Sequence, residues 1–219
     1  MTRSSDQVKR RYDSSTRRAR ADVARQRVLA SARELFLADG YASTTVAGVA
    51  RSAGVSPETV YKAFGGKPGL AKAVFDLGIA GPGVTPTDRR AAAVSRDVSD
   101  PVERLRAFGG FVAEVTPRVA PLMLLVRSAA EHDPELAEVW KQMTGERLAS
   151  MARHARRLFA DGHLRVGVSA EEARDVLWAY SSADLYDLLV RQRGWDVERY
   201  GRWVGDAYVA ALLPAGTGA

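Results

Sequence analysis

The segment from Val46 to Gly65 has the features that two short helices joined by a tight turn require. Ala50 is small where such helices would cross, and Gly54, four residues later, suits a left-handed backbone at the chain reversal. Ser56 can then cap the next helix, with Pro57 at its first position. The small core would be filled by Val49, Ala53, Val55, Val60 and Phe64. This combination predicts a helix-turn-helix, and an ordinary helical hairpin within a core is the alternative interpretation.

Helical signals continue on both sides of this segment. Apolar residues share one face from Ala21 up to Gly40, and a further helix fits residues 68–77. Downstream, Asp100-Pro101 and Asp133-Pro134 mark helix starts, and residues 169–172 form a capping box. Long amphipathic helices follow each start, although the prolines at 117 and 121 should break or kink the first. We therefore expect an all-α fold, with an N-terminal three-helix domain and a C-terminal helical bundle.

Charge divides the chain into unequal parts. The net charge is +6, yet residues 1–80 hold 14 Lys/Arg against 7 Asp/Glu, and residues 81–219 hold 18 against 19. Glycines and prolines cluster within residues 78–88, so we place a domain boundary at residues 80/81. Residues 1–20 are polar and rich in arginine, which predicts a flexible basic arm before a domain of residues 21–80. Such an arm favours a polyanionic partner, with a merely solubilising tail as the alternative.

Several classes of protein are disfavoured by composition. There are no cysteines, which excludes disulfides and thiol nucleophiles and fits a reducing cytoplasm. No apolar run approaches the ~18 residues needed to span a bilayer, so no membrane partner is expected. The three histidines form no metal-ligand pair at helical spacing, and no phosphate-binding loop or nucleophile motif occurs. We expect a cytoplasmic protein that is not an enzyme and uses no cofactor or metal, with a nucleoid-type binder lacking a ligand as a second rival.

The N-terminal pattern resembles a known family. Residues 40–46 read Gly-Tyr-Ala-Ser-Thr-Thr-Val, and Val49-Ala50, Ala53-Gly54-Val55-Ser56, Thr59-Val60-Tyr61, Phe64 and Lys67 follow in order. This series is similar to the DNA-binding domain of tetracycline-repressor (TetR) family regulators. It departs from many members at Lys62-Ala63, where a histidine often occurs. The resemblance implies a dimeric transcriptional repressor that places the second motif helix in the major groove of an inverted-repeat operator, and that a small molecule in residues 81–219 releases.

Side-chain chemistry suggests individual roles at the DNA. We expect base-edge contacts from Ser56, Pro57, Thr59 and Lys62, at the exposed start of the recognition helix. Glu58 could accept from cytosine, but we favour an electrostatic role at the helix start. Phosphate contacts are expected from Thr44 or Thr45, Tyr61 and Lys67. Arginines of the arm could reach an adjacent groove or the backbone, or remain solvated; these are Arg17, Arg18 and Arg20.

The C-terminal helices carry large apolar groups interspersed with polar ones. A core role is the simplest interpretation for each, and a pocket between bundle helices is the functional one. The candidate ligand-binding residues are Phe108, Phe111, Met123, Trp140, Met143, Arg147, Trp178 and Ser181. Arg147, Ser181 and Asp184 would need partners if buried. We further expect residues 170–192 and 196–213 to form the two helices of a dimer interface, the last through an apolar face of Tyr200, Trp203, Val204, Tyr208 and Leu212.

Overall fold

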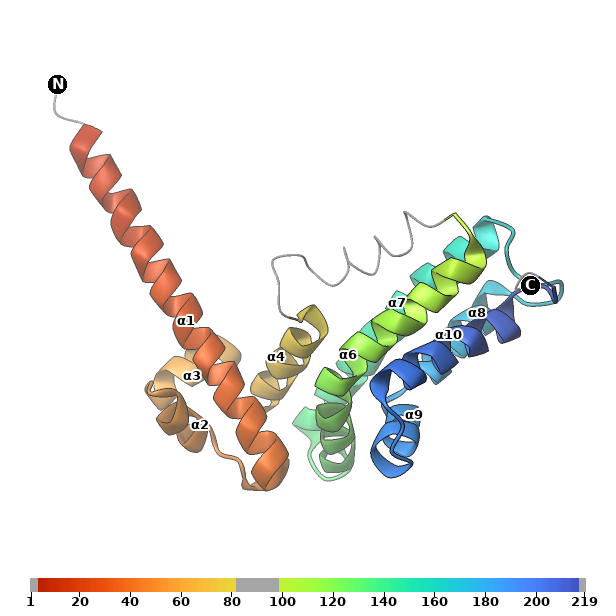
Figure 1. The fold of residues 1–219 in the computed structure, drawn as a ribbon. Coiled ribbons are helices and arrows are strands. Elements are labelled where there is room, and N and C mark those ends of the chain that lie inside the picture. Colours follow the sequence, from red (N-terminus) through yellow and green to blue (C-terminus); the bar gives the residue numbers. More distant parts are fainter. Residues whose placement is uncertain (1–3, 82–98, 217–219) are drawn as a thin grey trace. The chain divides into compact units, whose positions relative to one another are not determined.

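The computed structural model describes residues 4–81 and 99–216, with the side chains of residues 4–18 outside the description. The chain divides into two compact units, Met1–Val74 and Phe75–Ala219. Every regular element of the described residues is helical, as the sequence predicts (Figure 1). This division falls inside one helix, and the domain boundary that we expect at residues 80/81, beside residues outside the description, stays a prediction. The two units are considered separately below.

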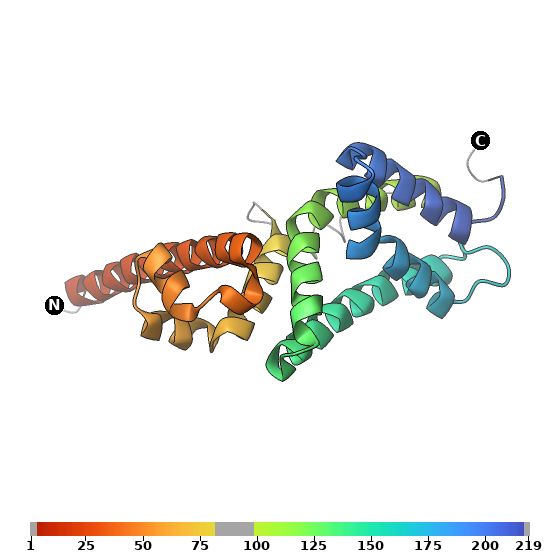
Figure 2. The same ribbon diagram turned by 90° about the horizontal axis from the view of Figure 1, so that it is seen from below.

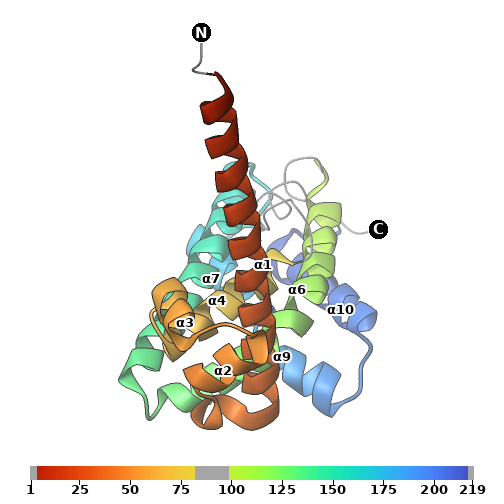
Figure 3. The same ribbon diagram turned by 90° about the vertical axis from the view of Figure 1, so that its left-hand side faces the viewer.

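The first unit contains α1 (Ser4–Ser43), α2 (Val46–Ala53), α3 (Pro57–Phe64) and the first residues of α4 (Lys67–Ala80). Figure 3 shows α1 beside the two short helices of the motif. Apolar side chains from all four helices form its core, and Val28, Phe36, Val49, Val60 and Leu70 are at most 1% exposed. This core fixes the position of α3, whose opposite face remains exposed.

Helix α1 begins earlier than the sequence pattern indicates. It begins at Ser4, so residues 4–20, where a flexible arm is expected, are helical. No glycine or proline occurs before Gly40, so nothing in residues 4–39 interrupts a helix that starts there. The backbone leaves the helical conformation at Gly40, with φ 81° and ψ 165°. Apolar periodicity detects only the part of a helix that packs, which is why the pattern begins near residue 21.

The second unit is built on two long helices, α6 (Pro101–Ala130) and α7 (Pro134–Ala160). Helix α6 runs through Pro117 and Pro121 without a break, and it bends along its course (Figure 2). Each internal proline removes one backbone hydrogen bond, so a bend is the expected consequence. Near the start of α6, Arg104 forms an ion pair with Asp161 at 2.9 Å, which joins this part of α6 to the end of α7.

One predicted long helix is interrupted after Tyr180. We expected a single helix over residues 170–192, and the structure has α8 (Ala170–Tyr180), α9 (Ala183–Tyr186) and a π-helical segment, η1 (Asp187–Gln192). The break occurs because Ser182 caps α9, accepting the Leu185 N–H at 3.2 Å. The hydroxyl of Ser181 donates to the carbonyl of Leu177 at 2.8 Å and closes the last turn of α8. Serine competes well with the backbone for such bonds, which favours a helix boundary at this pair.

The last helix, α10 (Val197–Leu212), packs against α6 within the same chain. Tyr200, Val204, Tyr208 and Leu212 are all fully buried without any partner subunit. For these four residues this corrects the interpretation of their face as a dimer contact, whereas Trp203 of the same predicted face is half-buried. The close packing depends on glycines: a Cβ on Gly109 would lie 2.5 Å from the carbonyl oxygen of Gly201.

Helix α6 is also long and apolar enough to cross a membrane, by length and composition alone, although no such stretch is expected from the runs of apolar residues. Over that stretch, 56% of its residues are buried inside the protein. Leu105, Val112 and Leu122 are among the buried side chains, and the helix as a whole packs against α7 and α10. A core helix of a helical bundle meets the same criteria, and this is the role that α6 has in the structure.

Candidate DNA-binding motif and internal cavity

The turn of the motif has the geometry that its sequence predicts. Thr45 caps α2 by accepting the Gly48 N–H at 3.0 Å. Gly54 follows α2 in the left-handed conformation, with φ 67° and ψ 41°, which a residue with a side chain rarely adopts. Ser56 then caps α3, accepting the Thr59 N–H at 3.3 Å. These local bonds define where α3 begins and direct its first turn away from the core.

The first turn of α3 presents a set of small polar groups. The predicted base-edge residues Ser56, Pro57, Thr59 and Lys62 are all exposed. Tyr61 lies beside them with 56% of its surface exposed. The backbone N–H of Glu58 and the Ser56 hydroxyl hold the pKa of the Glu58 carboxyl below its usual range. Glu58 is therefore an anion at the positive end of the helix, as an electrostatic role there requires.

Two predicted phosphate contacts are engaged inside the domain. The Thr44 side chain is buried, and its hydroxyl donates to the Gly40 carbonyl at 2.8 Å. The Lys67 ammonium donates to the carbonyl oxygens of Tyr41 at 2.9 Å and Ala42 at 3.3 Å, so it caps the end of α1. Either side chain would have to break these bonds before it could bind a phosphate. Thr45, by contrast, is exposed at the start of α2.

The basic segment is only partly described. Arg20 is exposed on α1, whereas the side chains of Arg17 and Arg18 lie outside the described residues. Two other arginines of α1 are closer to the motif than sequence reasoning indicates. The guanidinium of Arg25 lies 4.5 Å from the ring centroid of Phe64, at the end of α3. Arg27, two residues along α1, is also exposed.

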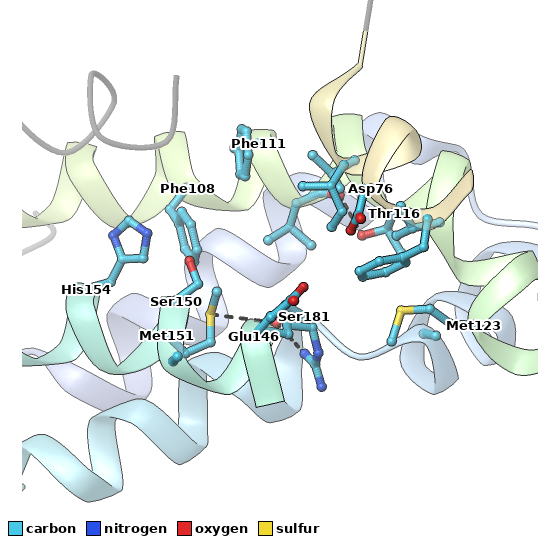
Figure 4. Close-up of a pocket in the computed structure, with 18 of the residues that line it drawn as sticks. Asp76, Phe108, Phe111, Thr116, Met123, Glu146, Ser150, Met151, His154 and Ser181 are labelled. Carbon is cyan, nitrogen blue, oxygen red and sulfur yellow. Dashed lines mark hydrogen bonds between the residues drawn. The ribbon is translucent and has the colours of Figure 1, made fainter. Parts of the chain in front are cut away.

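The second unit encloses a cavity of about 440 Å³ (Figure 4). Helix α6 supplies most of the apolar wall, including Phe108, Phe111 and Met123, and α7 supplies the facing wall. The last turns of α4 close one side with Phe75, Asp76 and Ile79. This volume lies within the range typical of small-molecule sites, and the mixture of apolar walls and a few polar groups is also typical of them.

The structure brings together five of the eight residues expected at a ligand site. Phe108, Phe111, Met123, Arg147 and Ser181 line the cavity. Trp140, Met143 and Trp178 do not. Met143 is fully buried in the core, and Trp178 lies outside with 36% of its surface exposed. The sequence also gave no sign of the contribution from α4, or of His154 and Ser150, because nothing in their local pattern distinguishes a cavity from a core.

Arg147 lines the cavity and is bonded to Ser181, another lining residue. Its Nη1 donates to the Trp178 carbonyl at 2.7 Å and to the Ser181 hydroxyl at 2.9 Å, and its guanidinium lies 4.5 Å from the centre of the Trp178 ring. Burial lowers the pKa of Arg147 to about 10, still well above neutrality, so it remains a cation. Asp184, a partner considered for it, instead binds Arg127 at 2.6 Å. No group of three or more possible metal ligands occurs among the described residues.

Comparison with known proteins identifies the motif. Residues 28–74 match the family model described as bacterial regulatory proteins, tetR family. These residues run from α1 through the motif into α4. They include Thr45, Gly54 and Ser56, which define the two helices of the motif. No curated protein matches the chain.

Solved structures with the same fold cover both units. The SmeT–triclosan complex has a TM-score of 0.69 and 24% identity, covering 90% of this chain and 94% of its own. NalD, the secondary repressor of the MexAB-OprM multidrug efflux pump in Pseudomonas aeruginosa, has a TM-score of 0.70 and 20% identity. The match covers 90% of this chain and 98% of NalD. The fatty acid degradation regulator FadR from Bacillus halodurans has a TM-score of 0.67 and 14% identity. The match covers 85% of this chain and 94% of FadR. NalD is a repressor and FadR a regulator, and the family that matches residues 28–74 is one of regulatory proteins, not of enzymes. Residues 28–74 are therefore a DNA-binding domain of the bacterial TetR family, and the chain as a whole has the fold of that family's transcriptional regulators.

Proposed function

We propose that the protein is a cytoplasmic, homodimeric transcriptional repressor that leaves an inverted-repeat operator when a small organic molecule enters the cavity. One observation carries the ligand response. The cavity wall includes Phe75, Asp76 and Ile79, which are in α4, and the same helix begins in the family's DNA-binding domain. A molecule in the cavity would contact α4 directly, so its binding free energy can depend on where that helix lies.

In this proposal α3 enters the major groove. Lys62 donates to a guanine, Ser56 and Thr59 read neighbouring base edges, and Pro57 packs on a thymine methyl. Thr45 and Tyr61 hold phosphates on either side, and the arm of residues 1–20 adds sequence-independent affinity through Arg17, Arg18 and Arg20. Residues 21–80 would then be the DNA-binding domain, and residues 81–219 the domain for the ligand and the second subunit.

The similar structures support a ligand-responsive repressor. The SmeT structure is a complex with triclosan, a small aromatic molecule, and NalD is a repressor of an efflux pump. The identities are 24% and 20%, so neither the ligand nor the target genes of these proteins carry over to this chain. Activation of transcription and DNA binding without a ligand are the alternatives, and the coupling experiment below separates the second of them from a ligand-responsive function.

Selection of bound sequences from random DNA would test the DNA-binding proposal and provide the operator. We expect an inverted repeat with half-sites about one helical turn apart, roughly 34–36 Å. Lys62→Ala should then relax the preference at one base position of each half-site and cost about 1–3 kcal/mol per contact. Arg51→Ala is the matched control, because Arg51 is exposed at the end of α2 and lies outside the first turns of α3. Unchanged base preference in Lys62→Ala would remove Lys62 from the reading of sequence.

The ligand response predicts reciprocal coupling. A molecule found by screening for changes in tryptophan fluorescence should bind more weakly to the operator complex than to free protein, by roughly 5–150-fold, and should weaken the operator by the same factor. Ala149→Trp should abolish both effects, because Ala149 is exposed and lines the cavity. Ala160→Trp serves as control, since Ala160 is equally exposed on α7 but does not line it. Equal ligand affinity with and without DNA would contradict release by ligand.

A further inference from the structure

We propose that the ligand of this cavity is an amphipathic organic anion, with one anionic oxygen group that binds Arg147 and an apolar body that lies against α6. The inference rests on the proposed ligand-responsive function and names the class of molecule that would act there. Two features carry it: a cation at one end of the cavity without a counter-ion, and an apolar wall along the rest.

The first feature is the incomplete bonding of Arg147. One terminal nitrogen is fully used by the Trp178 carbonyl and the Ser181 hydroxyl, both neutral groups. The Nε atom is buried and has no hydrogen-bond partner. Within the described part of the chain, no carboxylate lies at ion-pair distance from this guanidinium, whereas Arg104 and Arg127 in the same unit each bind an aspartate at 2.9 Å or less. Arg147 is half-buried, and a cation whose buried Nε donor is unused is costly unless a partner arrives.

The second feature is the composition of the walls. Phe108 and Phe111 stack with their ring centroids 6.1 Å apart, and Val115, Val119 and Met123 continue the same apolar surface along α6. Such a surface suits a hydrocarbon or aromatic body and gives no partner to a second charged group. The cavity therefore offers one strong site for an anion and a larger region for an apolar body.

A cationic ligand is the main competitor, because Asp76 and Glu146 also line the cavity. Both are solvent-exposed, and each already makes other interactions in the protein. Solvent weakens the attraction that an exposed carboxylate exerts, whereas the environment of Arg147 strengthens its own. A cation in the cavity would also be repelled by Arg147 itself. Arg153 is a second basic residue at the cavity, but it too is exposed.

Two fluorescent dyes with nearly the same skeleton test the inference in the full-length protein. Anilinonaphthalene sulfonate carries an anionic oxygen group, and phenylnaphthylamine is its neutral counterpart. We expect the anionic dye to bind roughly 10- to 100-fold more tightly, as a charge-assisted hydrogen bond allows. Arg147→Met should remove this preference and leave phenylnaphthylamine binding within about threefold, which also shows that the variant folds. Ala149→Trp should weaken both dyes if they occupy the cavity.

Matched arginine variants locate the anion. Arg156→Met removes an exposed charge from the same helix outside the cavity and should change neither affinity. Loss of the preference in Arg153→Met, but not in Arg147→Met, would overturn the assignment to Arg147. If Arg147→Met no longer binds phenylnaphthylamine either, the test rests on the other proteins. Tighter binding of the anionic dye to wild type, kept in Arg153→Met, then supports Arg147 as the anion site, and loss of that preference in Arg153→Met overturns it. Equal binding of the two dyes to wild type would overturn anion recognition while leaving the ligand-responsive function intact, and failure of both dyes to enter the cavity would overturn the inference and count against that function.

Discussion

Gly109→Ala is expected to lower the free energy of unfolding of the second unit by about 3 kcal/mol, near the upper end of overpacking effects. A Cβ at this position would lie 2.5 Å from both the carbonyl oxygen of Gly201 and the amide nitrogen of Gly205. These are backbone atoms of α10, so no side chain can rotate away and the two helices must separate. Separation would loosen the burial of Tyr208, whose ring lies 5.8 Å from that of Phe108 on α6.

Gly110→Ala is the matched control, one residue along the same helix. Its Cβ would have no heavy atom within 4 Å, so the substitution meets only open space. Alanine is favoured over glycine inside a helix by up to about 1 kcal/mol, which predicts unchanged or slightly higher stability. Thermal unfolding at fixed protein concentration should show Gly109→Ala melting about 6–12 °C lower and Gly110→Ala no lower than wild type. Similar melting of Gly109→Ala and wild type would show that α6 and α10 are not held this closely.

The motif could be predicted closely from sequence because its determinants are local. Thr45, Gly54 and Ser56 each act on backbone groups within three or four residues, so the chain itself specifies both helices and the turn. The same holds for the helix starts at Asp100 and Asp133. Long-range partners are different. The bonds of Lys67 to the end of α1 join groups 25 and 26 residues apart, and no local pattern announces them.

The cavity could be predicted only in part for a related reason. Helical periodicity shows which side chains point inward, but core and cavity occupy the same face. Phe108 and Met143 are both buried, yet only Phe108 borders the empty volume. The face of α10 was misassigned because burial by α6 and burial by a second subunit demand the same residues. Gly201 and Gly205, which permit the close approach of α6, were the signal in the sequence that favoured packing within one chain.

The dimer proposed here must therefore use a surface other than the buried face of α10. Two large apolar side chains of residues 170–192 remain exposed, Trp178 at 36% and Leu188 at 49%. They lie in α8 and η1, within the range expected from the sequence to contact a second subunit. Exposed apolar groups of this size favour an interaction surface, although single ones are common on any protein.

Leu188→Glu is expected to convert the protein into a monomer at micromolar concentration. A two-fold interface uses each patch twice, so one substitution brings two carboxylates into a surface that excludes water. A penalty of about 3 kcal/mol or more follows from such unpaired charges, equivalent to a weakening of the dimer of roughly 100-fold or more. Phe159→Glu is the control, since Phe159 is 58% exposed at the end of α7, outside the proposed interface. Light scattering should give the mass of one chain for Leu188→Glu and of two chains for Phe159→Glu, and operator affinity should fall only in the first, because a monomer binds a single half-site. A dimeric Leu188→Glu variant would place the subunit interface elsewhere on the molecule.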